Sequence, residues 1–343
     1  MPTSKTEGTE ISVGLGLLNI NQFDLKEQEI EKYFNHTLTH EKYREYVKNY
    51  DKNKNDYDRV FYVGQKIRDR YSFFEHLSSL NWTGPNKQAS TISVPKDIIA
   101  ANIPISIKVK SNVVYNLSPF NIFVSIPSAM QLAKNSPNWF IEQAYDEINK
   151  VYLYVKNQDQ GSFPDDIYEF EKKAKKEDRK RIKNIIAKFS TKQKNDFYGL
   201  YVTMCHKVAS NSAEIFNTKL ETSLNSNLRS STIELLAKTF FRVNAVEYIF
   251  CGIDKTKDFA VVVPDLTEWK RMWKIIRVNA APDLSREQSV VNISVECEGN
   301  KKRYTFDYHV EIRWSHGKFC GSPEGKLYKQ FSWLNVPFYR PLI

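Results

Sequence analysis

The sequence predicts an α/β protein, with a mixed-sheet core flanked by helices, a helical middle region and a mostly β C-terminal unit. Apolar residues recur at helical spacing in the first 80 residues and again in the middle of the chain. Short runs rich in β-branched residues fill residues 91–126 and the last hundred residues. Because 343 residues are too many for one ordinary core, we expect three consecutive units, over residues 1–160, 161–244 and 245–343.

The first unit is expected to start with two helices that follow a polar leader of about ten residues. The first helical pattern is "FDLKEQEIEKYFNHTLTHEKYREYVKNY" and the second is "DYDRVFYVGQKIRDRYSFFEHLSSL". Gly84 and Pro85 then interrupt the pattern. Three short strands and a helix over residues 137–155 are expected next, and the three strands are "TISVPKDIIA", "IPISIKVKS" and "FNIFVSIP".

The rest of the chain is expected to be helical first and β-rich afterwards. Helical spacing is seen in "FYGLYVTMCHKVA" and "STIELLAKTFFRVNAVEYIF", and the second of these is expected to end in a strand. Alternating or β-branched runs follow from about residue 245. The predicted strands there are "FAVVVP", "WKIIRVNA", "SVVNISVEC" and "YTFDYHVEIRWS".

The chain is basic, with a formal net charge of +10 and a pI near 9.1. Such a charge favours an anionic partner, for example nucleic acid or an acidic membrane surface. No apolar run approaches the roughly 18 to 20 residues that span a bilayer. The N-terminal "MPTSKTEGTE" has no apolar stretch after basic residues, as a signal peptide would. We therefore expect a cytoplasmic protein without a membrane partner.

Neither the cysteines nor the histidines show a strong metal-binding pattern. The four cysteines are far apart and contain no CxxC pair, which favours a reducing compartment. His36 and His40 in "HTLTH" have the i,i+4 spacing of one helical face. However, Thr37 stands where the HExxH metalloprotease pattern requires Glu. A helix end near solvent is the favoured reading of this pair, and metal binding is the alternative.

An acid and two lysines stand on what are predicted to be neighbouring strands. Asp97 is on the first, whereas Lys108 and Lys110 are on the second and share one face by the period-two rule. A nuclease needs a cation at the scissile phosphate, and Mg²⁺ needs only one or two protein carboxylates. Asp97 and Lys108 can therefore meet one phosphate. The alternative is that Asp97 closes a turn and the lysines lie on a solvated strand face.

These residues resemble the core of the PD-(D/E)xK nuclease superfamily, which includes type II restriction endonucleases. Asp97, two residues after Pro95, is similar to the first metal-binding acid, and Ser106, Ile107 and Lys108 are similar to the (D/E)xK tripeptide. Ser106 stands where the second acid is expected. The resemblance covers roughly residues 56 to 155 and implies a restriction-endonuclease-like mixed sheet.

The resemblance also implies Mg²⁺ as cofactor, with Asp97 as metal ligand and Lys108 polarising the phosphate or the attacking water. Lys110 shares the predicted face and could substitute for Lys108. The second acid would come from a helix, with Glu142 as the first candidate and Glu75 as the second. The predicted metal ligands are thus Asp97 and Glu142.

Most of the net charge lies in residues 171–194, where eleven Lys or Arg and three acids give a local charge of +8. If helical, this segment spans about 35 Å, which is enough to contact several phosphates of a duplex. The alternative is a solvated helix face with partial i,i+4 pairing. The residues expected to contact DNA are Lys172, Lys173, Lys175, Lys176, Arg179, Lys180, Arg181 and Lys183.

A second candidate for DNA contact is "EIRWSHGKFCGSPEGKLYKQ", residues 311–330. Arg313, His316 and Lys318 are polar residues beside aromatic ones, a combination that can hydrogen-bond base edges. An ordinary β-hairpin tip is the alternative. A Cys320–His316 nucleophile pair is a weaker one, because no orienting acid stands at a defined spacing.

The sequence therefore predicts a Mg²⁺-dependent endonuclease of the restriction or phage-defence type that acts on double-stranded DNA. The alternative is a non-catalytic, defence-associated DNA-binding protein whose sheet resembles a nuclease core. Cleavage of both strands would be simplest for a homodimer. The resemblance further implies a partner DNA methyltransferase that acts on the same site.

Overall fold

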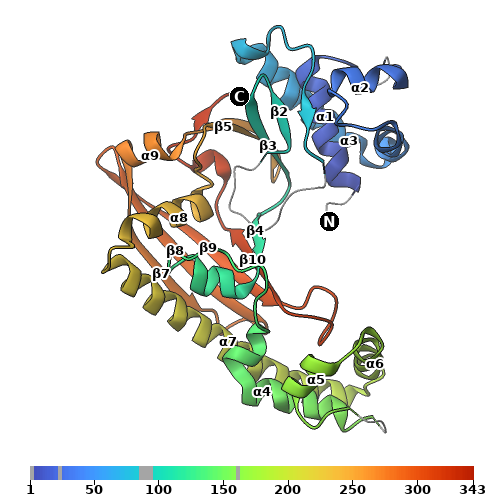
Figure 1. The fold of residues 1–343 in the computed structure, drawn as a ribbon, viewed down its shortest axis with the longest axis vertical. Helices are drawn as coiled ribbons and strands as arrows, with labels where there is room; N and C mark the ends of the chain where they lie inside the picture. Colours follow the sequence, from blue (N-terminus) through green and yellow to red (C-terminus); the bar gives the residue numbers. More distant parts are fainter. Residues whose placement is uncertain (1–3, 22–24, 85–95, 160–162) are drawn as a thin grey trace. The chain divides into compact units, whose positions relative to one another are not determined.

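The computed structural model describes residues 4–21, 25–84, 96–159 and 163–343. The chain forms two compact units (Figure 1). Unit 1 comprises Met1–Asn112, Phe241–Trp273 and Phe331–Ile343, and unit 2 comprises Val113–Phe240 and Lys274–Gln330. The predicted α/β class is confirmed, with two sheets of which one is mixed.

The two units differ from the three consecutive ones expected over residues 1–160, 161–244 and 245–343. The reason is a pairing between segments that are far apart in the sequence. Strand β3 (Ile103–Val109) pairs in parallel with β5 (Tyr248–Asp254), which brings the segment after residue 241 into unit 1. The chain then returns to unit 2 for most of its last strands.

Unit 1 is built on a six-stranded sheet in the order β1-β2-β3-β5-β6-β11. Only the β3–β5 pair is parallel among the strands of this sheet. Gly252 of β5 has a φ of +139°, and a Cβ atom there would lie 1.9 Å from the carbonyl oxygen of Lys108. Glycine is therefore required for this close approach. The other strands are β1 (Asn81–Trp82), β2 (Ile98–Ala100), β6 (Lys257–Val263) and β11 (Arg340–Pro341).

Helices α1 (Ser4–Leu18) and α3 (His40–Arg70) pack side by side and share a core with β2, β3 and β5 (Figure 1). Their backbones approach closely at Gly16, where a Cβ atom would lie 2.1 Å from the carbonyl oxygen of Phe61. The leader expected to be polar is thus part of a buried helix. Its acids have partners, since Glu7 pairs with Lys42 at 2.8 Å.

The two N-terminal helices expected from the sequence differ from those observed. The long helix α3 continues through both predicted segments, and the hydroxyl of Thr39 caps its start by accepting the Lys42 N–H at 3.3 Å. Before it come only short helical turns, η1 (Glu27–Glu29) and α2 (Ile30–Tyr33), and after it comes η2 (Ser72–Phe74).

Phe250 of the unit 1 sheet belongs to an aromatic cluster that includes residues from the end of the chain. Phe250 of β5 contacts Phe259 and Trp333 edge to face, with ring centroids 5.0 and 5.1 Å apart. Phe241 and Phe338 form another edge-to-face pair, with centroids 5.1 Å apart. Helix α9 (Leu266–Met272) and the turn η4 (Trp333–Asn335) supply further members of this cluster.

Unit 2 is built on a five-stranded sheet in the order β4-β10-β9-β8-β7. The long helix α7 (Thr191–Leu224) packs against β8, and Ser190 and Gln193 form a capping box at its start. Four of these strands confirm the predicted β-rich C-terminal region. They are β7 (Trp273–Pro282), β8 (Ser289–Gly299), β9 (Lys302–Arg313) and β10 (Glu324–Lys329), and the fifth is β4 (Val113–Leu117).

Helices α4, α5 and α6 gather at one end of α7 (Figure 1). Helix α4 (Trp139–Lys156) confirms the helix expected over residues 137–155, and the indole of Trp139 donates to the Ser212 hydroxyl of α7 at 2.9 Å. The predicted strand "FNIFVSIP" is wrong, because Asn121–Ser125 form a π-helical turn. The basic segment forms α5 (Ile167–Lys173), α6 (Lys176–Ala187) and the start of α7, and α8 (Arg229–Phe241) precedes β5.

Candidate nucleic-acid interface

Asp97 lies directly before β2 and uses its carboxylate to hold the neighbouring strand β3. Its backbone N–H donates to the carbonyl of Ile105 at 2.8 Å. Its side-chain Oδ2 accepts from the backbone N–H of Ile107 at 2.6 Å and from the Ser106 hydroxyl at 3.4 Å. The residue is only 8% exposed. The carboxylate therefore extends the hydrogen bonding between the two strands beyond the end of β2.

Arg242 contacts the Ser106 hydroxyl that donates to this carboxylate. Its Nη2 donates to the Ser106 hydroxyl at 3.1 Å, and its guanidinium lies 4.8 Å from the centroid of the Phe250 ring. The residue is 2% exposed, and its carbonyl accepts from the Tyr248 hydroxyl at 2.9 Å. The sequence pattern could not identify Arg242, because it stands in a turn between a helix and a strand and meets Ser106 only through the β3–β5 pairing.

These surroundings do not fit Mg²⁺. The ion keeps several of its waters and needs open space beside its carboxylates. Asp97 is buried and its Oδ2 already accepts two hydrogen bonds. The two candidate second ligands belong to different units, Glu75 to unit 1 and Glu142 to α4 of unit 2. Within the residues described, no group of three or more His, Cys, Asp or Glu is arranged to hold a metal ion.

The histidine pair at the start of α3 is held by glutamates. His40 Nε2 lies 3.1 Å from a carboxylate oxygen of Glu31, and His36 Nδ1 lies 3.4 Å from the other one. His40 is also the first residue of α3, and His36 lies at the surface. This geometry agrees with the predicted helix end near solvent.

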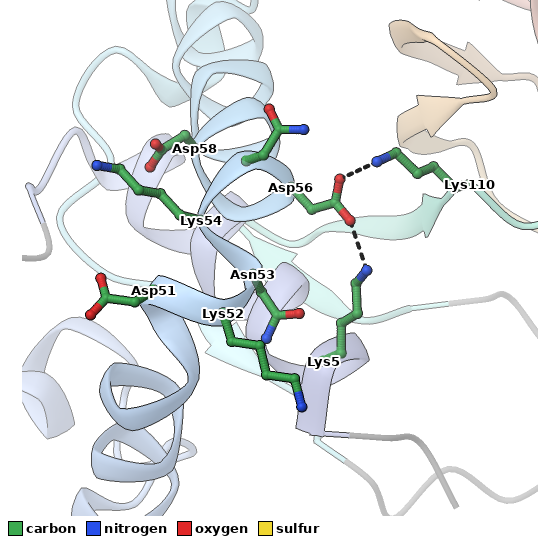
Figure 2. A pocket seen from close by; sticks show the side chains of 9 residues that line it. Lys5, Asp51, Lys52, Asn53, Lys54, Asp56, Asp58 and Lys110 are labelled. Carbon is green, nitrogen blue, oxygen red and sulfur yellow. Dashed lines mark hydrogen bonds and ion pairs between the residues drawn. The ribbon is translucent and has the colours of Figure 1, made fainter.

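The two lysines expected to share a catalytic face have different surroundings. Lys108 stands on β3 opposite Gly252 of β5. Lys110 follows the end of β3 with a φ of 51°, where the strand alternation has ended. Its ammonium pairs with the carboxylate of Asp56 on α3, which also binds Lys5 of α1 at 2.8 Å (Figure 2). Asp56 of α3 therefore joins the end of β3 to α1.

Asp56 lies at the edge of a depression of about 570 Å³. Burial alone would raise the pKa of Asp56, but the hydrogen bonds from Lys110 and Lys5 outweigh it and hold the pKa below its ordinary value. Figure 2 shows the Asp56 carboxylate between the two ammonium groups. The other lining residues are Asp51, Lys52, Asn53, Lys54, Asn55 and Asp58.

Replacing Asp56 by Asn is expected to lower the free energy of unfolding by about 1 kcal/mol at neutral pH, because both lysines are partly exposed and screened. Since folding lowers the Asp56 pKa, its contribution is fully present above the unfolded-state pKa and is lost as the pH falls through the folded-state value. Urea unfolding of wild type and D56N at neutral and strongly acidic pH measures this. The exposed Asp51→Asn on the same helix is the control, and an equal loss in both variants would contradict the prediction.

Part of the basic segment of unit 2 holds α5 and α6 in place. The Arg179 guanidinium binds both carboxylate oxygens of Glu171 at 3.0 Å and donates to the Phe319 carbonyl at 2.9 Å. Arg181 pairs with Asp159 at 2.8 Å, and Lys173 pairs with Glu169 at 2.7 Å. These three predicted DNA contacts are therefore engaged within the protein.

The other cations of the segment face solvent. Of the three acids, Glu171 is bound by Arg179, and Asp178 accepts the backbone N–H of Lys175 at the start of α6 at 2.9 Å. This leaves a surface that is strongly positive. The exposed lysines of the segment that make no ion pair within the described residues are Lys172, Lys175, Lys176, Lys180, Lys183, Lys188, Lys192 and Lys194. We call these eight lysines the basic surface.

The loop over residues 315–321, predicted to read bases, lies against α6. Lys183 Nζ donates to the His316 carbonyl at 3.4 Å, and the Lys183 side chain passes Gly317. Cys320 Sγ is directed to the Arg179 carbonyl at 3.8 Å, which does not support the alternative Cys320–His316 pair. The two segments expected to contact DNA thus meet in unit 2.

Arg313 and Lys318 lie beside this loop in different surroundings. Arg313 Nη1 is 3.3 Å from Glu311 on the same strand. The Lys318 ammonium lies 4.2 Å from the centroid of the Tyr201 ring, a cation–π contact. Burial lowers the pKa of Lys318 below its ordinary value. The sequence could not indicate the partnership with Tyr201, which comes from α7 more than a hundred residues earlier.

Two regions of predicted function are therefore different in kind. The Asp97 region is a buried network that joins strands, whereas the basic surface consists of accessible cationic groups. No helix in the described ranges is long and apolar enough to cross a membrane. No family model matches the chain, and neither a curated protein nor a solved structure matches it significantly.

Proposed function

We propose that the chain is a non-catalytic DNA-binding protein that holds duplex DNA by its phosphate backbone, with unit 2 as the contact surface. The observation that carries this proposal is the basic surface, whose eight lysines are exposed and have no acidic partner within the described residues. Lysines on an ordinary solvated helix face alternate with acids that can pair with them. In residues 171–194, two of the three acids already have other partners, because Glu171 pairs with Arg179 and Asp178 accepts the Lys175 backbone N–H.

The physical basis of binding would be the release of counterions. Each lysine that neutralises a phosphate releases a condensed cation, so affinity arises without base contacts and falls steeply with salt. Helix α6 has 12 residues and is about 18 Å long, which allows it to contact several phosphates. Such contacts position a duplex but carry no sequence information.

The loop beside α6 is where sequence preference would enter, if the protein has any. His316 and Ser315 are exposed on that loop, and both side chains can hydrogen-bond base edges. Cleavage is left out of the proposal, because the surroundings of Asp97 do not fit Mg²⁺. The homodimer and the partner methyltransferase stay predictions and are not needed for backbone binding.

Binding to closed circular duplex DNA tests the proposal, since this substrate has no ends. We expect the logarithm of the binding constant to fall with the logarithm of the salt concentration with a slope of about −5 or steeper, as for six or more phosphate contacts. Filter binding over about 50 to 200 mM salt measures the slope. The same samples with Mg²⁺ are expected to show no nicked or linear DNA.

Three outcomes would count against the proposal. Absence of binding at the lowest salt would overturn it outright. Much tighter binding to duplex RNA of equal length would replace DNA by RNA as the partner. Linear or nicked products that require Mg²⁺ would restore the endonuclease prediction, and Asp97→Ala would then show whether that residue takes part.

A further inference from the structure

A recess of about 380 Å³ lies in unit 2 beside the loop over residues 315–321. Three of the residues that line it are cations, Arg313, Lys318 and Lys326. No lining residue within the described part of the chain is Asp or Glu. These cations come from β9, the loop and β10. The remaining lining residues are Tyr201, Gln288, Trp314, Ser315 and Gly317.

The two aromatic rings that line this recess already contact other side chains of the protein, which argues against a stacked base as its ligand. Trp314 is 9% exposed and packs edge to face on Phe140, with centroids 4.5 Å apart. Tyr201 is covered by the Lys318 ammonium at 4.2 Å. The groups left to interact with a ligand are therefore the cations and polar N–H donors, which favours an anion.

Two buried N–H groups of the lining residues strengthen this choice. Arg313 Nε and Trp314 Nε1 are buried and have no hydrogen-bond partner within the described residues. A buried donor without an acceptor is costly. Phosphate oxygens are strong acceptors, and Arg binds them with several N–H groups at once.

The recess is continuous with the basic surface. Lys183 of α6 contacts both His316 and Gly317, and Gly317 lines the recess. A DNA segment held on α6 would therefore pass beside the opening. An internal phosphodiester continues in both directions and can lie only across such an opening, whereas a strand end can enter it. A terminal phosphate also carries about two negative charges instead of one, which suits the two ammonium groups of Lys318 and Lys326 together with the Arg313 guanidinium, whose Nη1 is shared with Glu311.

We infer that this recess binds the terminal phosphate of a DNA strand, so that the protein holds duplex DNA near its ends. The inference rests on the proposed DNA binding and adds a preference among DNA molecules. Arg313, Lys318 and Lys326 are the residues that would contact the phosphate.

The test compares hairpin duplexes that have one free end and carry a 5′-phosphate, a 3′-phosphate or only hydroxyl groups. Fluorescence anisotropy is expected to show about tenfold tighter binding for one of the phosphorylated hairpins. In the double variant Lys318→Met, Lys326→Gln this difference is expected to disappear, while affinity for the hydroxyl hairpin changes by less than about threefold. The double variant Lys219→Gln, Lys302→Gln removes the same charge from unit 2 outside the recess and should keep the difference.

The outcomes separate this inference from the proposed function. Equal binding of all three hairpins by wild-type protein, with circular DNA still bound, would overturn the inference alone. Absence of binding to hairpins and circular DNA would overturn both. Competition by inorganic phosphate at equal concentration to the DNA end would assign the recess to free phosphate and overturn the DNA-end assignment. Thermal unfolding of each variant ensures that a lost difference reflects the recess and not the fold.

Discussion

Replacing Lys176, Lys180, Lys188 and Lys192 together by Gln is expected to weaken binding to circular duplex DNA by about 100-fold or more near physiological salt. Each of these lysines is exposed and makes no ion pair within the described residues. If all four contact phosphates, the slope of the salt dependence should become less steep by about 3 to 4. The folded state should be little affected, since no side-chain contact that holds α6 is removed.

A control with the same net charge separates the surface from the overall charge. Lys26, Lys48, Lys66 and Lys257 are exposed lysines of unit 1, and their replacement by Gln also lowers the formal charge from +10 to +6. This variant is expected to keep affinity within about threefold of wild type and to keep the salt slope, because the slope counts the lysines that neutralise phosphates and these four are not assigned to the contact surface. Equal weakening in both variants would show that net charge alone attracts DNA and would contradict the assignment to the basic surface.

The sequence identified elements with strong periodicity and failed where short apolar runs were ambiguous. The strands β6 to β9 and helix α4 formed as expected, because their alternation or helical spacing extends over many residues. The run "FNIFVSIP" forms a π-helical turn, since a short apolar run fits a strand and a buried helical turn equally well. Helix α1 was not predicted, because its glycines and acids make the segment look polar and irregular in sequence. The segment is buried because the glycines allow close packing against α3.

The candidate site shows the same division between local and long-range information. The sequence predicted Asp97 on a strand next to that of Ser106; Asp97 lies directly before β2, and the two side chains do meet. It could not reveal that Arg242 joins them, because that contact is 136 residues away along the chain and depends on the β3–β5 pairing. The basic segment was visible from composition alone. Its division into engaged and solvent-facing cations required the positions of Glu171 and Asp159.

Replacing Asp97 by Ala is expected to lower the free energy of unfolding of unit 1 by about 3 kcal/mol. The Ile107 N–H, which donates to this carboxylate at 2.6 Å, would lose its acceptor in a buried position. The buried Ser106 hydroxyl, which Arg242 contacts at 3.1 Å, would also lose the carboxylate as its acceptor. The exposed Asp51→Ala on α3 is the control, with an expected change within about 0.5 kcal/mol.

The same variant distinguishes a strand-joining carboxylate from a metal ligand. If Asp97 joins strands, the loss of stability in Asp97→Ala should be the same with Mg²⁺ and with a chelator, and hydrogen exchange at the Ile107 amide should become faster in both. A metal ligand behaves in the opposite way, because binding of Mg²⁺ to the native state alone stabilises it by mass action. Wild-type protein would then be stabilised by added Mg²⁺, and Asp97→Ala would lose that response. Such a response, together with unchanged exchange at Ile107, would support Asp97 as a metal ligand, which is the role that its resemblance to a nuclease motif predicts.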